Sequence, residues 1–378
     1  MSKYERKTLP LLMNESLNLF YNNCKLKHLS AELQDFFDSE QYKVSRKFSI
    51  TTLFSQGIKY NNAIEGYNDD LEVIEDVINN IDIGNVPVEK RQRILNLYKG
   101  YQYILKKRKI NKKNLKELYE LLSENLIEKE DFLIMGENYR NKDVYIHYSR
   151  NLEIEPDRGV KAELIDEKME QLFSFINDDS FKDNQIESFI KSQIIHFYFV
   201  YIHPYYDING RTARTVAMWH LLHDNSYPFL IFNRGVILDK SRYYRIIRDV
   251  VQYNNVTFFL NYMIKVVKEE LEKEYIIKKI DSKTKLTDLE RQNIYNFLSF
   301  KKPDTIIDFT VIYNRFNEMK KPNYVYEKML TPLFEKEIFL VERETKKNIN
   351  GEISNQKFTF NENIIDLEES YVKKYIRK

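Results

Sequence analysis

The chain contains very few of the residues that cross-link or interrupt a polypeptide. It has a single cysteine, Cys24, among 378 residues, so no disulfide can form within it and a reducing compartment is expected. It has only 9 glycines and 8 prolines, which favours long helices with few turns. No stretch approaches the roughly 20 apolar residues that cross a bilayer, and no apolar signal sequence follows the polar start Met1–Lys7. We therefore expect a cytoplasmic protein without membrane contacts.

The chain also lacks an excess of charge of either sign. Its 59 basic and 57 acidic residues leave a net charge of +2, which argues against a general nucleic-acid coat. With 43% hydrophobic residues it can bury a sizeable core, and it is too long for one simple domain. We expect an N-terminal helical region at 1–90, a central domain at 91–277 and a C-terminal domain at 278–378.

The spacing of apolar residues predicts a mainly α fold. Helical patterns occur at residues 9–22, 29–42, 49–64, 69–81, 88–107, 112–126, 160–177, 184–202, 211–224 and 239–274. The segment 136–148 differs, because its end, Asp143–Tyr148, is aromatic and β-branched. We expect a strand or short hairpin there.

The C-terminal part carries a different pattern. Charged residues at Lys278–Lys285 indicate a linker. Beyond it, helices are expected at 286–300, 309–319 and 323–336, and strands at 338–343 and 356–360 joined by a polar turn at 345–354. Three helices followed by a β-hairpin is the order of a winged-helix domain. The charged tail from Asn361 is expected to form a last helix or a frayed end.

One polar segment, His203–Arg214, lies between two apolar helical stretches, Phe189–Ile202 and Val216–Leu222. It reads His-Pro-Tyr-Tyr-Asp-Ile-Asn-Gly-Arg-Thr-Ala-Arg. Such a loop brings together a base, a carboxylate, backbone amides at a helix start and two arginines. These are the groups that a phosphate-binding site requires.

The first residues of this segment suggest distinct roles. His203 is a candidate general base, and Pro204 places it at a helix exit. Asp207 is a candidate Mg²⁺ ligand, since this ion prefers carboxylate and phosphate oxygens. Asn209 and Gly210 let backbone amides face outward at the start of the next helix. Each residue alone also fits an ordinary role: a helix-end histidine, an N-cap aspartate or an Asn-Gly turn.

Arg211 and Arg214 are three residues apart in the first turn of the following helix and therefore share a face. Two cations at a helix N-terminus oppose the helix dipole, which is mildly unfavourable unless an anion is bound. This conflict favours a phosphate-binding role for the pair.

The ordered set resembles the signature of the Fic family, His-Pro-Phe-x-Asp/Glu-Gly-Asn-Gly/Lys-Arg with a further arginine shortly after. The matching residues are His203, Pro204, Tyr205, Asp207, Asn209, Gly210, Arg211 and Arg214. The similarity covers about residues 50–275 and implies a Fic-type helical bundle with a β-hairpin flap. Tyr205 replaces Phe, and Ile208 replaces the first Gly. If that second position needs a positive φ, a β-branched residue is strained there.

The resemblance implies a protein adenylyltransferase that moves AMP from ATP to a Tyr, Ser or Thr hydroxyl of another protein or of itself. In that reaction His203 is the catalytic base and Asp207 holds Mg²⁺. The residues implied to bind the nucleotide are Asn209, Gly210, Arg211 and Arg214. ATP and Mg²⁺ are the expected substrate and cofactor.

Upstream, Asn61–Gly66 resembles the family's inhibitory motif, Ser/Thr-x-x-x-Glu-Gly/Asn. The resemblance implies that Glu65 pairs with Arg214 and prevents productive nucleotide binding. A carboxylate then occupies the guanidinium fork that would hold a terminal phosphate. Asn61 stands where the family has Ser or Thr.

Two further segments resemble parts of the family. Gly136–Arg140, leading into Val144–Ile146, is similar to the flap hairpin that holds a target polypeptide by strand addition. A plain connecting hairpin is the alternative. Ser241–Tyr244 is similar to the start of a later helix that borders the nucleotide base.

Two other functions stay open. One is a regulator whose winged helix binds DNA while the Fic domain senses a nucleotide. Residues 285–345 hold ten basic and ten acidic residues, however, whereas DNA binding needs a clear positive footprint. We therefore favour a protein-contact or dimerisation module in a homo-oligomer. The other is a Fic enzyme that uses another nucleotide, or that removes AMP with Glu65 orienting a water.

Overall fold

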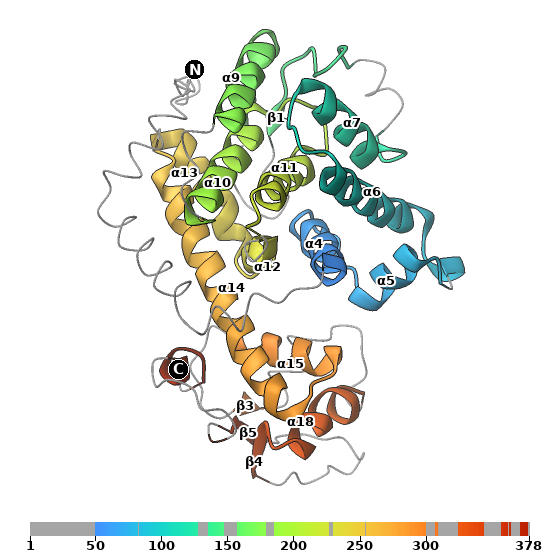
Figure 1. Ribbon diagram of the computed structural model, residues 1–378, viewed down its shortest axis with the longest axis vertical. Helices are drawn as coiled ribbons and strands as arrows, with labels where there is room; N and C mark the ends of the chain where they lie inside the picture. Colours follow the sequence, from blue (N-terminus) through green and yellow to red (C-terminus); the bar gives the residue numbers. More distant parts are fainter. Residues whose placement is uncertain are drawn as a thin grey trace. The chain divides into compact units, whose positions relative to one another are not determined.

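A computed structural model describes most of the chain after residue 49 (Figure 1). The described residues are 50–81, 83–127, 135–146, 157–178, 185–226, 230–253, 255–299, 307–308, 324–343, 357–361, 363 and 371–376. The helices expected at 9–22, 29–42 and 309–319 and the turn at 345–354 lie outside these residues. None of the described helices combines the length and apolar character needed to cross a membrane.

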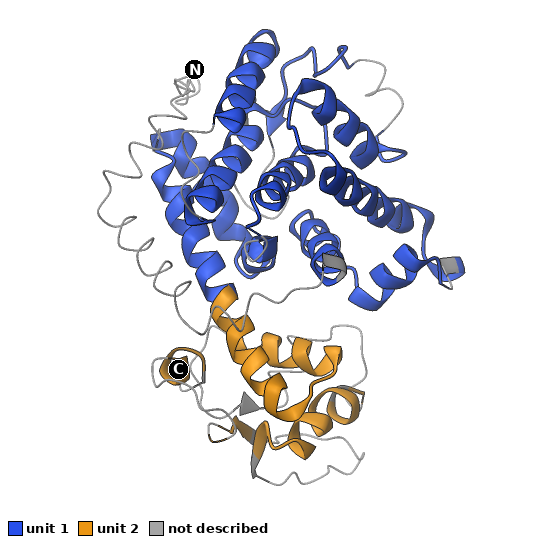
Figure 2. Ribbon diagram, in the orientation of Figure 1, with its two compact units in different colours: residues 1–270 blue, residues 271–378 orange. Residues whose placement is uncertain are grey.

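The chain divides into two compact units, residues 1–270 and 271–378 (Figure 2). The first unit is mainly helical, as predicted. Its elements are α4 (Ile50–Ile64), α5 (Leu71–Asn79), η1 (Ile83–Asn85), α6 (Val88–Lys106), α7 (Lys112–Ser123), β1 (Tyr145–Ile146), β2 (Asp157–Arg158), η2 (Ala162–Leu164), α9 (Ile165–Asn177), α10 (Gln185–Ile202), α11 (Asn209–His223), α12 (Phe232–Ile237), α13 (Lys240–Tyr253) and α14 (Thr257–Thr284), of which α14 continues into the second unit.

The centre of the first unit is the helix α11, which contacts α10, α6, α7 and α4 (Figure 1). Apart from Gly210, its residues from Asn209 to Leu222 are all buried. A helix that is enclosed on every side must be apolar on every side or have its polar groups paired. Two side chains near its end anchor it to the last turn of α6: Trp219 Nε1 donates to Lys107 O at 2.5 Å, and His223 Nε2 lies 2.7 Å from Ile104 O. The loop between α10 and α11 is therefore held by two buried helices.

Two helices differ from the sequence expectation. The single helix expected at 239–274 is two helices, α13 and α14. The break occurs next to Asn255, whose Oδ1 accepts a hydrogen bond from Thr257 N at 3.0 Å, as a capping side chain does. The helix α14 then runs to Thr284, so most of the segment 278–285 that we interpreted as a linker is helical. The short helix α12 was not predicted.

The second unit holds a three-stranded antiparallel sheet. After the end of α14, its elements are α15 (Asp288–Leu298), β3 (Ile307–Asp308), the π-helical turn η4 (Val325–Leu330), α18 (Thr331–Glu335), β4 (Phe339–Arg343), β5 (Lys357–Phe360) and the π-helical turn η6 (Val372–Ile376). The strand order is β3-β5-β4, and β3 was not predicted.

Aromatic side chains form the core of this second unit. Phe339 of β4 packs against Phe297 of α15 at 5.0 Å between ring centroids, and against Phe358 of β5 at 5.2 Å. The helix α15 begins with a capping box formed by Thr287 and Glu290. The described elements follow the predicted order, with β3 added. The winged-helix assignment stays a prediction, because the helix expected at 309–319 lies outside the described residues.

Candidate functional site

His203 lies directly after the last residue of α10, as Pro204 predicts. Its backbone has φ 53°, in the left-handed region that non-glycine residues rarely adopt. This conformation costs on the order of 1–3 kcal/mol and is typical of functional positions. The imidazole Nδ1 lies 3.2 Å from Val200 O. A tautomer that donates from Nδ1 to this carbonyl leaves the lone pair on Nε2, as a general base requires.

Tyr205 anchors the loop in the core. Its side chain is 1% exposed and stacks on Tyr119 with ring centroids 3.5 Å apart. Burial raises the pKa of the Tyr205 phenol well above its ordinary value. Asn209 braces the same residue, since its Oδ1 accepts from Tyr205 N at 2.9 Å and its Nδ2 donates to Tyr205 O at 2.8 Å. In this conformation the Asn209 amide, which we expected at the nucleotide, holds the loop in shape.

Ile208 has φ 64° and ψ 9°, so this position does require the left-handed conformation that glycine adopts freely. The strain amounts to about 1–2 kcal/mol for a residue with a Cβ atom. Burial of the Ile208 side chain, which is 3% exposed, offsets a similar amount. The turn is further fixed by Asp207 Oδ1, which accepts from Ile208 N at 2.6 Å, and by Thr212 Oγ1, which donates to Ile208 O at 2.8 Å. The turn therefore tolerates isoleucine.

The ion pair between Glu65 and Arg214 that the resemblance implies is present. The Arg214 side chain is 1% exposed and that of Glu65 is 30% exposed. Arg214 Nη2 donates a hydrogen bond to Glu65 Oε1. Asn61, the departure from Ser or Thr, supplies a supporting bond: its Oδ1 accepts from Arg214 Nε at 2.7 Å. Its Nδ2 donates to Tyr101 OH at 3.2 Å. The amide thus supports the pair in place of a hydroxyl.

Glycine at position 210 permits this pair to form where it does. A Cβ atom there would lie 2.6 Å from Glu65 Oε1 and 3.2 Å from Arg214 Nη1. The carboxylate of Glu65 therefore lies against the start of α11, where backbone amides and the helix dipole attract an anion. The charge of Glu65 occupies the region that the sequence assigned to a phosphate.

The charges in the site depend on one another. Burial raises the pKa of the Glu65 carboxyl, but the charge and hydrogen bond of Arg214, aided by Arg211 and Lys240, outweigh it and lower that pKa. Burial lowers the pKa of the Arg211 guanidinium, while Glu65 and Asp207 oppose the shift. Arg211 is 8% exposed, and its Nε has no hydrogen-bond partner among the described residues. A buried charged donor of this kind is costly, and an anion would satisfy it.

A change at Asn61 offers a test of this support. We expect Asn61→Ala to lower the free energy of unfolding by about 1–3 kcal/mol, because it leaves the buried Arg214 Nε without its acceptor. Urea unfolding, followed by circular dichroism, measures the difference. The matched change Asn61→Ser keeps an acceptor and should cost less. Equal stability of Asn61→Ala and the unaltered protein would contradict the supporting role.

The expected flap hairpin is present in part. β1 pairs antiparallel with β2, Tyr145 opposite Arg158 and Ile146 opposite Asp157. The sequence predicted β1 within 136–148 but not β2, and residues 147–156 lie outside the described part. Tyr145 is 67% exposed.

Near Arg214 lies a buried polar pair that the sequence did not single out. Tyr243 OH is 2.9 Å from His196 Nε2. Burial, and to a lesser extent the charge of Arg214, hold the pKa of His196 well below its ordinary value, so the imidazole is neutral at neutral pH. The neighbouring Tyr244, expected beside the base of a nucleotide, donates to Ile64 O at 3.1 Å and holds the end of α4.

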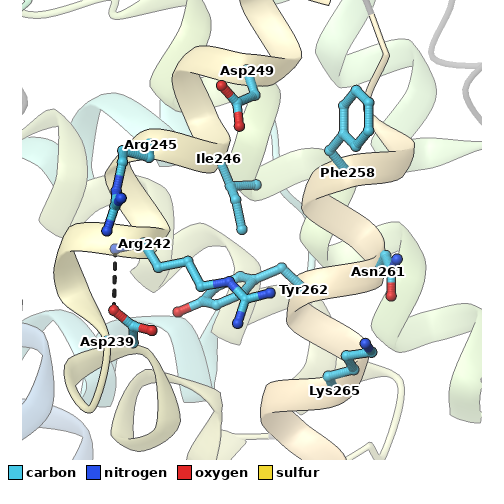
Figure 3. A pocket seen from close by; sticks show the side chains of 9 residues that line it. All are labelled: Asp239, Arg242, Arg245, Ile246, Asp249, Phe258, Asn261, Tyr262 and Lys265. Atoms are coloured by element: carbon cyan, nitrogen blue, oxygen red, sulfur yellow. Dashed lines mark hydrogen bonds between the residues drawn. The ribbon is translucent and has the colours of Figure 1, made fainter.

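A separate cavity of about 450 Å³ lies between α13 and α14 (Figure 3). Both charge signs line it, and none of its residues belongs to the loop His203–Ile208. The lining residues are Asp239, Arg242, Arg245, Ile246, Asp249, Phe258, Asn261, Tyr262 and Lys265. Among the described residues, no group of three or more His, Cys, Asp or Glu could hold a metal ion. Asp207, the expected Mg²⁺ ligand, is exposed.

Residues 109–221 match the Fic/DOC family. The solved structures that are similar to this chain at low identity include the following three. A Fic family protein from Desulfovibrio desulfuricans is 15% identical with a TM-score of 0.49, covering 93% of this chain and 96% of that one. A fragment of Fic-1 from C. elegans is 15% identical with a TM-score of 0.47, covering 71% and 73%. A Fic domain containing signaling protein from Bacteroides thetaiotaomicron is 15% identical with a TM-score of 0.40, covering 67% and 98%.

Proposed function

Since this chain carries a Fic/DOC-family domain at residues 109–221, we propose that it is an autoinhibited protein adenylyltransferase. Proteins with this domain are generally transferases of nucleotidyl or other phosphate-containing groups. The substrate of the proposed reaction is ATP, and the acceptor is a Tyr, Ser or Thr hydroxyl of another protein or of the chain itself. The observation that carries the proposal is the Glu65–Arg214 ion pair placed against Gly210.

The reaction needs one proton acceptor. His203 Nε2 takes the proton from the acceptor hydroxyl as its oxygen bonds to the α-phosphorus of ATP. The bond between the α-phosphorus and the oxygen that links it to the β-phosphorus breaks. Pyrophosphate leaves with the electron pair of that bond. In such a transfer the protein forms no covalent bond to the transferred group. Its main contributions are positioning and electrostatic stabilisation.

The phosphates are held at the start of α11. The backbone amide of Gly210 and the helix dipole attract negative charge, and Arg211 brings a buried donor that an anion would satisfy. Asp207 would hold Mg²⁺, which neutralises phosphate charge when bound. Arg214 binds the terminal phosphate once Glu65 leaves its guanidinium.

Autoinhibition follows from the position of Glu65. Its carboxylate occupies the fork of Arg214 and lies where a phosphate would approach Gly210. A phosphate in the same place would meet a negative charge at close range, which is strongly unfavourable. Nucleotide binding in a productive pose therefore requires Glu65 to move away.

The conformation of Ile208 is compatible with AMP transfer. Its backbone has the positive φ that glycine would supply, and its side chain is buried. The test uses Glu65→Gly protein with ATP labelled at either the α- or the γ-phosphate. Label from the α-phosphate alone on protein supports AMP transfer. Label from the γ-phosphate instead overturns it, and AMP leaving a pre-modified protein faster with Glu65 than without it points to AMP removal.

For the second unit we favour a protein-contact role within a homo-oligomer over DNA binding. Two of its lysines are already paired, since Lys336 Nζ lies 2.6 Å from Glu290 Oε2 and Lys374 Nζ lies 2.6 Å from Glu272 Oε2. Paired lysines contribute less to the positive footprint that phosphates require.

A gel-shift experiment separates these two roles. We expect no shift of duplex DNA of mixed sequence at low salt, where non-specific binding is strongest. A salt-sensitive shift would establish a DNA role. Light scattering in the same buffer measures the mass of the particle in solution. A mass that is a multiple of the chain mass supports the homo-oligomer, and the mass of a single chain contradicts it.

A further inference from the structure

The side chain of Arg140 joins three segments of backbone in the first unit. Arg140 is 2% exposed, and its backbone forms an isolated antiparallel bridge with Met135. Its Nη1 donates to Lys142 O at 2.6 Å and its Nη2 to Val160 O at 2.5 Å. Its Nε donates to His203 O at 2.7 Å.

Two of these carbonyls belong to the ends of the β1–β2 hairpin. Lys142 precedes β1 and Val160 follows β2, while His203 belongs to the loop that carries the base. A guanidinium is planar and its donors have fixed directions, so one side chain fixes the relative positions of all three segments. The backbone adds a further link, because Arg140 N donates to Pro204 O at 2.9 Å.

The packing around this guanidinium leaves little room for movement. Gly159 N donates to Val144 O at 2.8 Å and continues the hairpin beyond β2. A Cβ atom at Gly159 would lie 3.0 Å from Arg140 Nη2 and 3.1 Å from Val144 Cγ2. A side chain at position 159 would therefore have to displace Arg140 or Val144 by a few tenths of an ångström.

Of the three contacts, the one at His203 bears on the position of the proposed base. The carbonyl that Arg140 holds belongs to a residue with φ 53°, whose conformation persists only if its surroundings fix it. The direction of the imidazole depends on that backbone conformation. The position of the base is thereby linked to the position of the hairpin.

We propose that Arg140 is a positioning residue that fixes His203 relative to the hairpin on which a target polypeptide pairs. This inference rests on the proposed function. A segment that adds to the β1–β2 hairpin by backbone hydrogen bonds takes its position from the hairpin. Because Arg140 holds that hairpin and His203 O together, the target hydroxyl reaches the imidazole at a set distance. A misplacement of about 1 Å can cost on the order of a hundredfold in rate.

The rate experiment uses the full chain in the Glu65→Gly background and measures pyrophosphate release from ATP. We expect Arg140→Lys to lower kcat roughly 10- to 100-fold, because an ammonium keeps the charge but cannot reach three carbonyls in one plane. The KM for ATP should change by less than about twofold, since the phosphate-binding residues are untouched. The same exchange at the exposed Arg108 is the matched control and should leave both values unchanged.

A second readout does not depend on activity. In protein labelled with ¹³C at histidine, the His203 signal is assigned by its loss in His203→Ala. We expect this signal to shift in Arg140→Lys and in the milder Gly159→Ala, and to stay in place in Arg108→Lys. An unchanged His203 signal in Arg140→Lys overturns the inference, and so does a loss of kcat that is matched by a loss of ATP affinity. Absence of pyrophosphate release in Glu65→Gly alone would count against the proposed function, while the His203 signal still decides the role of Arg140.

Discussion

Replacement of Glu65 by glycine is expected to raise AMP transfer by roughly 10- to 150-fold. The estimate follows from loss of one charge-assisted hydrogen bond to a buried arginine, worth about 1.5–3 kcal/mol. With that bond gone, Arg214 keeps its contact with Asn61 Oδ1 at 2.7 Å and stays oriented, while its Nη2 becomes available to a phosphate. The approach to Gly210 opens in the same step, because the atom that a Cβ there would meet at 2.6 Å is Glu65 Oε1. Label transferred from α-labelled ATP to protein measures the change.

Two further changes make this result specific. Glu65→Gln keeps the length of the side chain and removes its charge, so it should give an intermediate rate. Glu72→Gly removes an exposed acid in the first turn of α5 and should leave the rate as it is. Equal rates for the unaltered protein and Glu65→Gly would contradict autoinhibition by Glu65.

The sequence predicted the helices that have clear apolar spacing and clear ends. α4, α6 and α10 begin and end within one residue of the expected bounds. The sequence did not predict the break next to Asn255. Helical spacing of apolar residues continues on both sides of the break, and a capping side chain does not alter that spacing. The six residues of α12 are too few to show a period.

The candidate site was predicted as a set of residue types in order, which is why His203, Asp207 and the two arginines could be found. The contacts that hold these residues in place could not be predicted from the sequence. Arg140 meets His203 across 63 positions of the chain, and Tyr243 meets His196 across 47. A lone arginine in a polar segment, or a histidine in an apolar helix, carries no sequence signal of such a partner. The same holds for Asn61, whose amide supports Arg214 where a hydroxyl was the expected group.

Replacement of His203 by alanine in the Glu65→Gly background is expected to lower AMP transfer by about 10²- to 10⁴-fold, the range that a positioned general base contributes. The effect should fall on the chemical step, because in the proposed reaction the imidazole takes the proton and the start of α11 holds the phosphates. The affinity for ATP, measured by calorimetry, should therefore stay close to that of Glu65→Gly. Transfer is measured with α-labelled ATP as before.

A second histidine provides the matched control. His223 ends α11, and its Nε2 lies 2.7 Å from Ile104 O, so His223→Gln alters an imidazole that takes no part in the proposed reaction. Its transfer rate should equal that of Glu65→Gly alone. If His203→Ala keeps the full rate, the proton goes elsewhere and the assignment of the base is wrong. If His203→Ala loses transfer and ATP binding together, His203 maintains the shape of the loop, since a base that acts only on the acceptor hydroxyl contributes nothing to the affinity for ATP.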